Sequence, residues 1–229
     1  MSTLKEVLKQ KIDAHRPRTT RLVKECGDVA LGEVTIAQAI GGARGIKCLV
    51  TDISYLDPME GIRFRGMTIP ETFAALPKVP GSDYPYVEGF WYLLLTGDVP
   101  TMEQTLEVVE DWKQRSQVPS YVIDVLRAMP RDSHPMAMFS AAIVAMQRDS
   151  VFASNYAAGK FNKMTCWEDM LEDSNDLMAK LGPIAAYIYR MKYKGDTHIA
   201  ADPNLDMGGN FAHMIGQCDE YKDVARMYF

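Results

Sequence analysis

The chain has 229 residues, which is enough for one large domain or two small ones. Its hydrophobic content of 47% and charged content of 24% are typical of a globular protein, and no apolar run approaches the ~20 residues of a membrane helix. The net charge of −5 argues against a nucleic-acid-binding protein, because there is no basic excess to neutralise phosphates.

The N-terminal 40 residues predict two helices and one short strand. Thr3-Leu4-Lys5-Glu6 has the S/T-x-x-E pattern of a capping box and opens an amphipathic helix. We expect Arg16-Pro17-Arg18 to break this helix, with another beginning over residues 20–26. Residues 29–36 are rich in β-branched side chains with Gly32 among them, which favours a short strand or a bulge.

A β hairpin is predicted over about residues 46–66. Two short apolar runs, 46–51 and 62–64, flank the polar turn Asp57-Pro58-Met59-Glu60-Gly61. Proline presets one turn dihedral and glycine permits positive φ, so the two runs are expected to fold back on each other.

Nearly everything after the hairpin predicts helix. A short helix begins at Ile69-Pro70-Glu71, and residues 78–85 form a loop. Residues 86–95 are apolar on most sides and predict a buried helix. Further helices are expected over these segments: after the capping box at Thr101, 119–129, 134–149, 166–192 after a capping box at Thr165, from Asp202-Pro203, and 219–229. The fold class is therefore mainly α with one small β element.

No complete catalytic constellation is visible in the chain. His15 lies at the end of the first predicted helix, His134 precedes a proline at a helix start, His198 is in a polar loop, and His213 is on a helix without an acidic partner. None of them is expected to pair locally with a carboxylate as a general base would. The four cysteines form no CxxC pair, which favours reduced buried thiols over a metal site: Cys26, Cys48, Cys166 and Cys218.

The chain resembles the N-terminal half of eukaryotic-type citrate synthase from Leu4 to Phe229. The resemblance rests on several motifs that occur in the same order and at the same spacing as in that family. They are Gly41-Gly42-x-Arg44-Gly45, Leu56-Asp57-Pro58-x-Glu60-Gly61-Ile62-Arg63-Phe64-Arg65-Gly66, Ile69-Pro70-Glu71, residues 88–97, His134-Pro135-Met136 and Asn210-Phe211.

The resemblance implies an almost wholly helical large domain spanning 1–229. It also implies a homodimer that condenses acetyl-CoA with oxaloacetate and water to citrate and CoA, with no permanently bound cofactor and no metal. Residues 134–149 and 166–192 match the family's dimer-interface helices. The family suggests the mitochondrial matrix, but Glu6 and Asp13 are acidic residues that a presequence avoids, so no presequence is visible.

The resemblance also implies that the catalytic histidines, the aspartate base and the oxaloacetate arginines follow after Phe229. The chain stops within an apolar helix face, which indicates an N-terminal part of a longer protein. We therefore expect no catalytic residue within these 229 residues. The alternative interpretation is a truncated, inactive relative that serves as an interaction or structural partner.

One ligand contact can be carried over by resemblance. Arg44 matches an arginine that reaches the phosphates of CoA, and its flanking glycines leave the backbone clear for that role. The family's second CoA arginine, contributed by the partner subunit, falls at Asn162 here, where Lys160 or Lys163 is the candidate replacement. A substrate clamp formed by Arg63 and Arg65 on one strand face is a second hypothesis, but ion pairs that hold the hairpin to the helices are favoured.

Overall fold

The structure is a computed structural model that describes residues 3–43, 45–46, 49–217 and 219–228. Its elements, in chain order, are α1 (Thr3–Cys26), α2 (Ile36–Ile40), β1 (Ser54–Asp57), β2 (Gly61–Phe64), β3 (Met67–Thr68), α3 (Ile69–Ala75), α4 (Val87–Thr96), α5 (Met102–Arg115), α6 (Ser120–Ala128), α7 (Pro135–Met146), η1 (Gln147–Asp149), α8 (Val151–Ala157), α9 (Cys166–Tyr193), α10 (Met207–Ile215), η2 (Asp219–Tyr221) and α11 (Lys222–Tyr228). The mainly helical class predicted from the sequence is confirmed.

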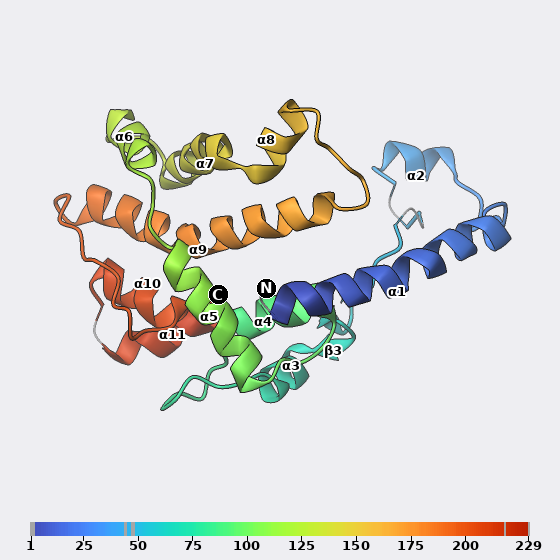
Figure 1. Ribbon diagram of the computed structural model, residues 1–229, viewed down its shortest axis with the longest axis horizontal. Helices are drawn as coiled ribbons and strands as arrows, with labels where there is room; N and C mark the ends of the chain where they lie inside the picture. The colour runs from blue at the N-terminus through green and yellow to red at the C-terminus, as the bar shows by residue number, and fades with distance from the viewer. Residues whose placement is uncertain (1–2, 44, 47–48, 218, 229) are drawn as a thin grey trace.

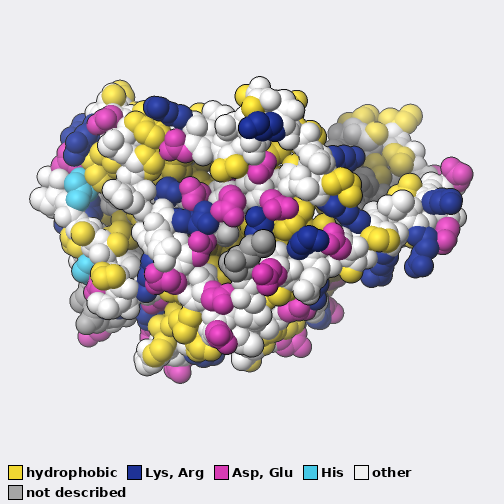
Figure 2. Space-filling model, viewed as in Figure 1, with side chains coloured by type: hydrophobic (Ala, Val, Ile, Leu, Met, Phe, Trp, Pro, Cys, Tyr) yellow, Lys and Arg dark blue, Asp and Glu magenta, His cyan; other side chains and the backbone are white. Residues whose placement is uncertain are grey.

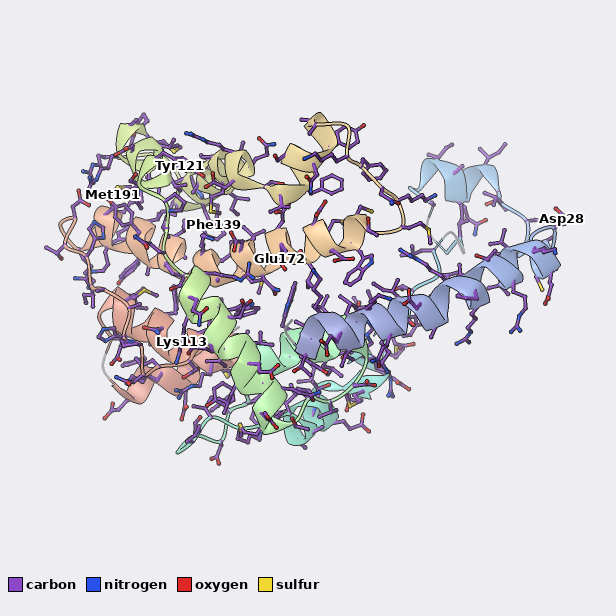
Figure 3. The ribbon with its side chains drawn as sticks, viewed as in Figure 1. Asp28, Lys113, Tyr121, Phe139, Glu172 and Met191 are labelled. Carbon is purple, nitrogen blue, oxygen red and sulfur yellow. The ribbon has the colours of Figure 1, made fainter. Side chains whose placement is uncertain are left out.

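The long helix α9 is the central element of the fold. It contacts α7 and α8 on one side and α5 and α10 on the other, so it runs between two layers of helices (Figure 1). Its C-terminal half packs against α6 and α7 through a cluster of apolar side chains, and Figure 3 labels three residues of this cluster, Tyr121, Phe139 and Met191. The buried members of this cluster are Val122, Leu126, Met138, Ala142, Ile184, Ile188 and Met191.

A second core lies where α1, α4, α5 and α9 meet. Leu4, Tyr92, Val108, Trp112 and Ala179 are buried there. Asn175 on α9 serves this core as a shared acceptor, because its Oδ1 accepts the indole N–H of Trp91 at 3.0 Å and that of Trp112 at 3.2 Å. Buried donors need such a partner, so Asn175 ties α4 and α5 to the central helix.

The N-terminal region differs from the prediction in two places. α1 continues through Pro17 as one helix of 24 residues, although a break was expected. Pro17 is exposed, so water can solvate the carbonyl that its missing N–H leaves without a helical partner. Residues 29–35 form no strand, and the helix α2 begins at Ile36 behind a capping box between Thr35 and Gln38.

The predicted hairpin is present but is shorter and shifted. β1 and β2 pair antiparallel, with Ser54 opposite Phe64 and Asp57 opposite Gly61, and β3 adds a third strand. The apolar run at 46–51 is not a strand over its described residues, and residues 47–48 lie outside them. Asp57 closes the turn, since its Oδ1 accepts the backbone N–H groups of Met59 and Glu60.

Helix starts follow the capping signals in some cases only. The capping box of Thr101 and Gln104 is present as predicted, and α3 starts behind a box formed by Thr68 and Glu71. Thr165 makes no capping hydrogen bond, so the box predicted there is wrong. α10 begins at Met207, with Asp206 as the cap, rather than at Asp202-Pro203.

The arm formed by the end of α1, α2 and the following loop projects from the helical body (Figure 1). Apolar side chains are exposed on α2, at the upper right of Figure 2, where hydrophobic atoms lie at the surface. Ile36 is 80% exposed and Ile40 is 83% exposed. The helical body, in contrast, buries both cores described above.

Candidate functional site

Arg44, the predicted ligand contact, lies outside the residues that the structure describes. The loop around it is described on both sides and starts at the C-terminus of α2. Gly41 caps that helix, and its backbone N–H donates to the carbonyl oxygen of Ala37 at 2.9 Å. The N–H of Ala43 donates to the carbonyl oxygen of Gln38, also at 2.9 Å. The described residues 41–43 are therefore fixed to the C-terminal end of α2.

The backbone on either side of Arg44 adopts left-handed conformations. φ is +78° at Gly42, +61° at Ala43 and +74° at Gly45. A side chain strains this conformation, so glycine is favoured at 42 and 45 for backbone reasons. No atom lies within 4 Å of a Cβ built at Gly42, so the position is open. Gly42 and Gly45 thus meet a backbone requirement, and the space beside Gly42 is open.

Arg65 anchors the other end of the loop. Its Nη1 donates to Asp52 Oδ1 at 3.1 Å, and its guanidinium also donates to the carbonyl oxygens of Leu94 and Leu95 at the end of α4. Those carbonyls have no partner within the helix, so the arginine caps α4. The ion-pair role expected for this arginine is confirmed.

Arg63 and Arg65 do not share a strand face, which corrects the basis of the clamp hypothesis. β2 ends at Phe64, and Arg65 has φ +50°, which turns it out of the strand. Arg63 pairs with Glu60 at 2.8 Å and donates to the carbonyl oxygen of Gly66. Both arginines are therefore used in holding the hairpin.

A cavity of about 400 Å³ lies between α1, Asp52 and the end of α4, next to this anchor. Its charged lining comes mainly from cations, which are Lys11, Arg16, Arg18 and Arg65, whereas Asp52 is its only carboxylate among the described residues. Arg16 also donates to the carbonyl oxygen of Met164 at 2.7 Å, which brings the loop before α9 close to α1. Lys11 is paired with Asp98 and Arg65 with Asp52, so the excess of positive charge that suits an anionic group comes from Arg16 and Arg18.

The loop before α9 contains the position at which the family's second CoA arginine is expected. Asn162 is exposed, and its Oδ1 accepts the backbone N–H of Met164 at 2.9 Å. The neighbouring Lys160 and Lys163 are exposed. Asn162 is therefore used within its own turn, whereas two ammonium groups beside it face solvent.

The histidines are placed mostly as predicted, with one exception. His134 caps α7, because its Nδ1 accepts the N–H of Met136 at 3.2 Å. His15 is exposed as expected, although it lies within α1 rather than at a helix end. The expectation that no histidine pairs locally with a carboxylate is wrong, since His198 Nε2 lies 2.8 Å from Asp196 Oδ1. Asp196 has φ +62°, and this turn brings the two side chains together.

Both members of the pair of His198 and Asp196 have a further partner, since Asp196 binds Arg131 and His198 stacks on Tyr187. Arg131 donates to the other carboxylate oxygen at 2.9 Å, and the hydrogen bonds of Arg131 and His198 lower the pKa of Asp196. The ring of His198 stacks on Tyr187, with centroids 3.9 Å apart. These contacts link the loop after α9 to α9 itself and to the loop after α6, so their role is structural.

Neither thiols nor carboxylates form a metal centre in the described part of the chain. No group of three or more His, Cys, Asp or Glu side chains there could hold an ion. Cys26 is exposed and Cys166 is half-buried, both as free thiols, so the prediction of buried thiols is wrong for these two. Cys48 and Cys218 lie outside the described residues.

Among the described helices, none is both long and apolar enough to cross a bilayer.

Sequence reasoning missed one unusual acidic residue, Glu88. It lies on α4, is 2% exposed, and its burial raises the pKa of its carboxyl to about 7. Its contact is with the start of α10, which is 119 positions away in the chain. No local pattern in the sequence signals such a contact, because a glutamate near a helix N-terminus is usually a favourable surface residue.

Comparison with known proteins identifies the family. Residues 42–229 match the family described as citrate synthase, C-terminal domain. The chain belongs to the citrate synthase family. It is 42% identical over 228 residues to the mitochondrial citrate synthase of Aspergillus niger, and 44% identical over 227 residues to that of Saccharomyces cerevisiae. These alignments cover 99% of this chain but 48% and 47% of the relatives, so the chain spans about half their length.

Solved citrate synthase structures share the fold. The enzyme from Pyrobaculum aerophilum superposes with a TM-score of 0.67 at 21% identity, covering 86% of this chain and 47% of that one. The Thermoplasma acidophilum citrate synthase, solved as a ternary complex with carboxymethyl coenzyme A and oxaloacetate, gives a TM-score of 0.61 at 22% identity. That match covers 80% of this chain and 44% of the other. The helical arrangement around α9 is thus the citrate synthase fold.

Proposed function

We propose that this chain forms the N-terminal part of a citrate synthase, which condenses acetyl-CoA with oxaloacetate and water to give citrate and CoA. Within that reaction the chain supplies a contact to the phosphates of CoA through Arg44. The histidines, the aspartate base and the oxaloacetate arginines of the reaction lie outside these 229 residues. Family membership, shared over nearly the whole chain, is the observation that carries this proposal.

The geometry next to Arg44 supports the CoA contact. The backbone is turned by three left-handed residues, one end of the loop is fixed on α2, and the other is fixed through Asp52 and Arg65. A guanidinium on such a loop can bind phosphate oxygens in a bidentate manner without reordering the backbone. The cationic cavity beside α1 adds a favourable potential for the polyanionic part of CoA.

Calorimetric titration with CoA tests this contact. Arg44→Met is expected to weaken binding about tenfold or more, since a charge-assisted hydrogen bond contributes roughly 1.5–3 kcal/mol. Arg21→Met is the matched control, because Arg21 is an exposed arginine of α1 outside the lining of the cavity. Equal affinities of all three proteins would refute the role of Arg44.

We also propose that the protein is a homodimer that pairs through α7 and α9. α7 is apolar over most of its length, yet only Met138 and Ala142 are buried on it. On its outer face Met136 is 61% exposed and Val144 is 72% exposed, and small residues there would let a partner helix approach closely. These features support an interface that the chain on its own leaves uncovered.

Light scattering after gel filtration measures the oligomeric state. Val144→Asp is expected to halve the mass, because it would place a carboxylate in the apolar interface. Leu106→Asp is the control, since Leu106 is 43% exposed on α5, away from this face. A monomeric wild type, or a dimer that tolerates Val144→Asp, would contradict the proposed interface.

The compartment we propose is the mitochondrial matrix, as the names of the relatives suggest, and immunofluorescence against a matrix marker tests it.

A further inference from the structure

The carboxyl group of Glu88 is buried, and only one of its two oxygens has a hydrogen-bond partner. Its Oε1 accepts the backbone N–H of Met207, the first residue of α10, at 3.2 Å. Its Oε2 is buried and has no partner. A buried polar atom without a partner is rare in a native fold and indicates an unseen ligand, a water or a proton.

A small cavity lies next to this carboxyl. Its volume is about 50 Å³, which exceeds what one water molecule needs. α9 contributes only Ala179, Gly182 and Pro183 to its described lining, and the side chains with polar atoms there are Glu88, Trp112, Lys113, Ser116 and Asn210. Lys113, labelled in Figure 3, extends from α5 on the side of α10, and its side chain is half-buried. Water in this cavity would lie in a space lined by both Glu88 and Lys113.

The charges around Glu88 do not neutralise an anion there. Asp206, the cap of α10, is itself a buried acid that raises the pKa of Glu88. Arg226 from α11 is already bound to Asp206 and to Asp223, so its charge is compensated. Tyr86, which precedes α4, has the pKa of its phenol raised by burial first and then by the charges of Asp206 and Glu88. Burial raises the pKa of Glu88 and outweighs the groups that lower it, which are the backbone N–H groups of Glu88 and Met207 and the ammonium group of Lys113.

We propose that Glu88 and this cavity form a proton-binding site, in which water carries the proton between the carboxyl and the surface beside Lys113, and that loss of the proton unseats the start of α10. The proton leaves Oε2 as hydronium and the charge stays on Glu88. The carboxylate then gains hydration if α10 moves away, because the cavity opens to solvent. α10 carries Asn210-Phe211, so the site sets the position of a family motif, and the inference goes beyond the proposed function.

Infrared spectroscopy detects the proton directly. At pH 6 nearly all surface carboxyls are ionised. The difference between the spectra of the wild type and of Glu88→Gln is therefore expected to show one carboxylic-acid carbonyl band. This band should disappear as the pH rises through about 7. Lys113→Met removes the favourable cation, so the loss of the band should move to higher pH. Absence of the band at pH 6, or a Lys113→Met protein that loses it at unchanged pH, overturns the proposal.

Hydrogen exchange of the α10 amides tests the unseating. After correction for intrinsic exchange, their protection should fall about tenfold per pH unit between about 5 and 7 and then level off, since the opened state releases the proton. Glu88→Gln should abolish this dependence, while Glu110→Gln, the same change at an exposed site on α5, should keep it. If Glu88→Gln does not fold, the wild type and Lys113→Met still decide the matter. Wild-type protection that is independent of pH overturns the proposal, and neither experiment depends on CoA binding.

Discussion

The crossing of α10 and α11 leads to a sharp prediction about one glycine. A Cβ added at Gly208 would lie 2.8 Å from Arg226 Cγ, 3.0 Å from its Cα and 3.1 Å from its backbone nitrogen. Two of these three atoms belong to the backbone of α11, so a side-chain rotation cannot relieve the clash. α11 would have to move away from α10 as a unit.

The magnitude follows from two opposing effects. Overpacking of this kind costs about 1–3 kcal/mol, while alanine in a helix is favoured over glycine by up to about 1 kcal/mol. Moving α11 also loosens the buried pair of Arg226 and Asp206. We therefore expect Gly208→Ala to lower the free energy of unfolding by about 1–2 kcal/mol.

Urea unfolding followed by circular dichroism measures this change, and Gly182→Ala is the control. Gly182 is also buried and helical, but the nearest atom to its added Cβ is Met207 Cε at 4.0 Å. Its replacement should leave stability unchanged or raise it by up to about 1 kcal/mol. If Gly208→Ala is as stable as Gly182→Ala, the close approach of α11 to α10 is not present.

Three further predictions concern buried groups and caps. Since the pKa of Glu88 is raised from 4.5 to about 7, the folded state holds a proton that the unfolded state releases, so wild-type stability should fall between pH 4.5 and 7 by about 3 kcal/mol. Glu88→Gln should show no such fall in urea unfolding, and identical pH profiles would contradict this. Asn175→Ala should cost about 2–4 kcal/mol, because two indole donors lose their acceptor; a loss under about 1 kcal/mol would show that they find other partners. Thr101→Ala should cost about 1 kcal/mol through loss of the α5 cap, and an unchanged midpoint would place the helix start elsewhere.

Local signals in the sequence predicted those parts of the fold that local interactions determine. The box at Thr101 fixes the start of α5 because its partner Gln104 is three residues away. The turn of the hairpin is set by Asp57, whose carboxylate accepts the backbone N–H groups of Met59 and Glu60. In both cases the stabilising contact lies within the window that a sequence pattern covers.

The features that sequence reasoning missed depend on contacts between distant segments. Arg65 caps α4 from 29 positions away, so the inference that Arg63 and Arg65 share one strand face was wrong. Glu88 is buried because α10 covers it, and neither helix signals the other. His198 meets Asp196 only because the backbone at Asp196 is left-handed, which its residue type permits but does not require.

The most direct test of the proposed function is thiol release from acetyl-CoA in the presence of oxaloacetate. We expect the 229-residue chain to bind CoA in an Arg44-dependent manner but to release no thiol, because we propose that the catalytic histidines and the aspartate base belong to the other half of the enzyme. Extension with the second half of a citrate synthase sequence should restore oxaloacetate-dependent release. Thiol release by residues 1–229 alone, or no release after the extension, would contradict the proposed function.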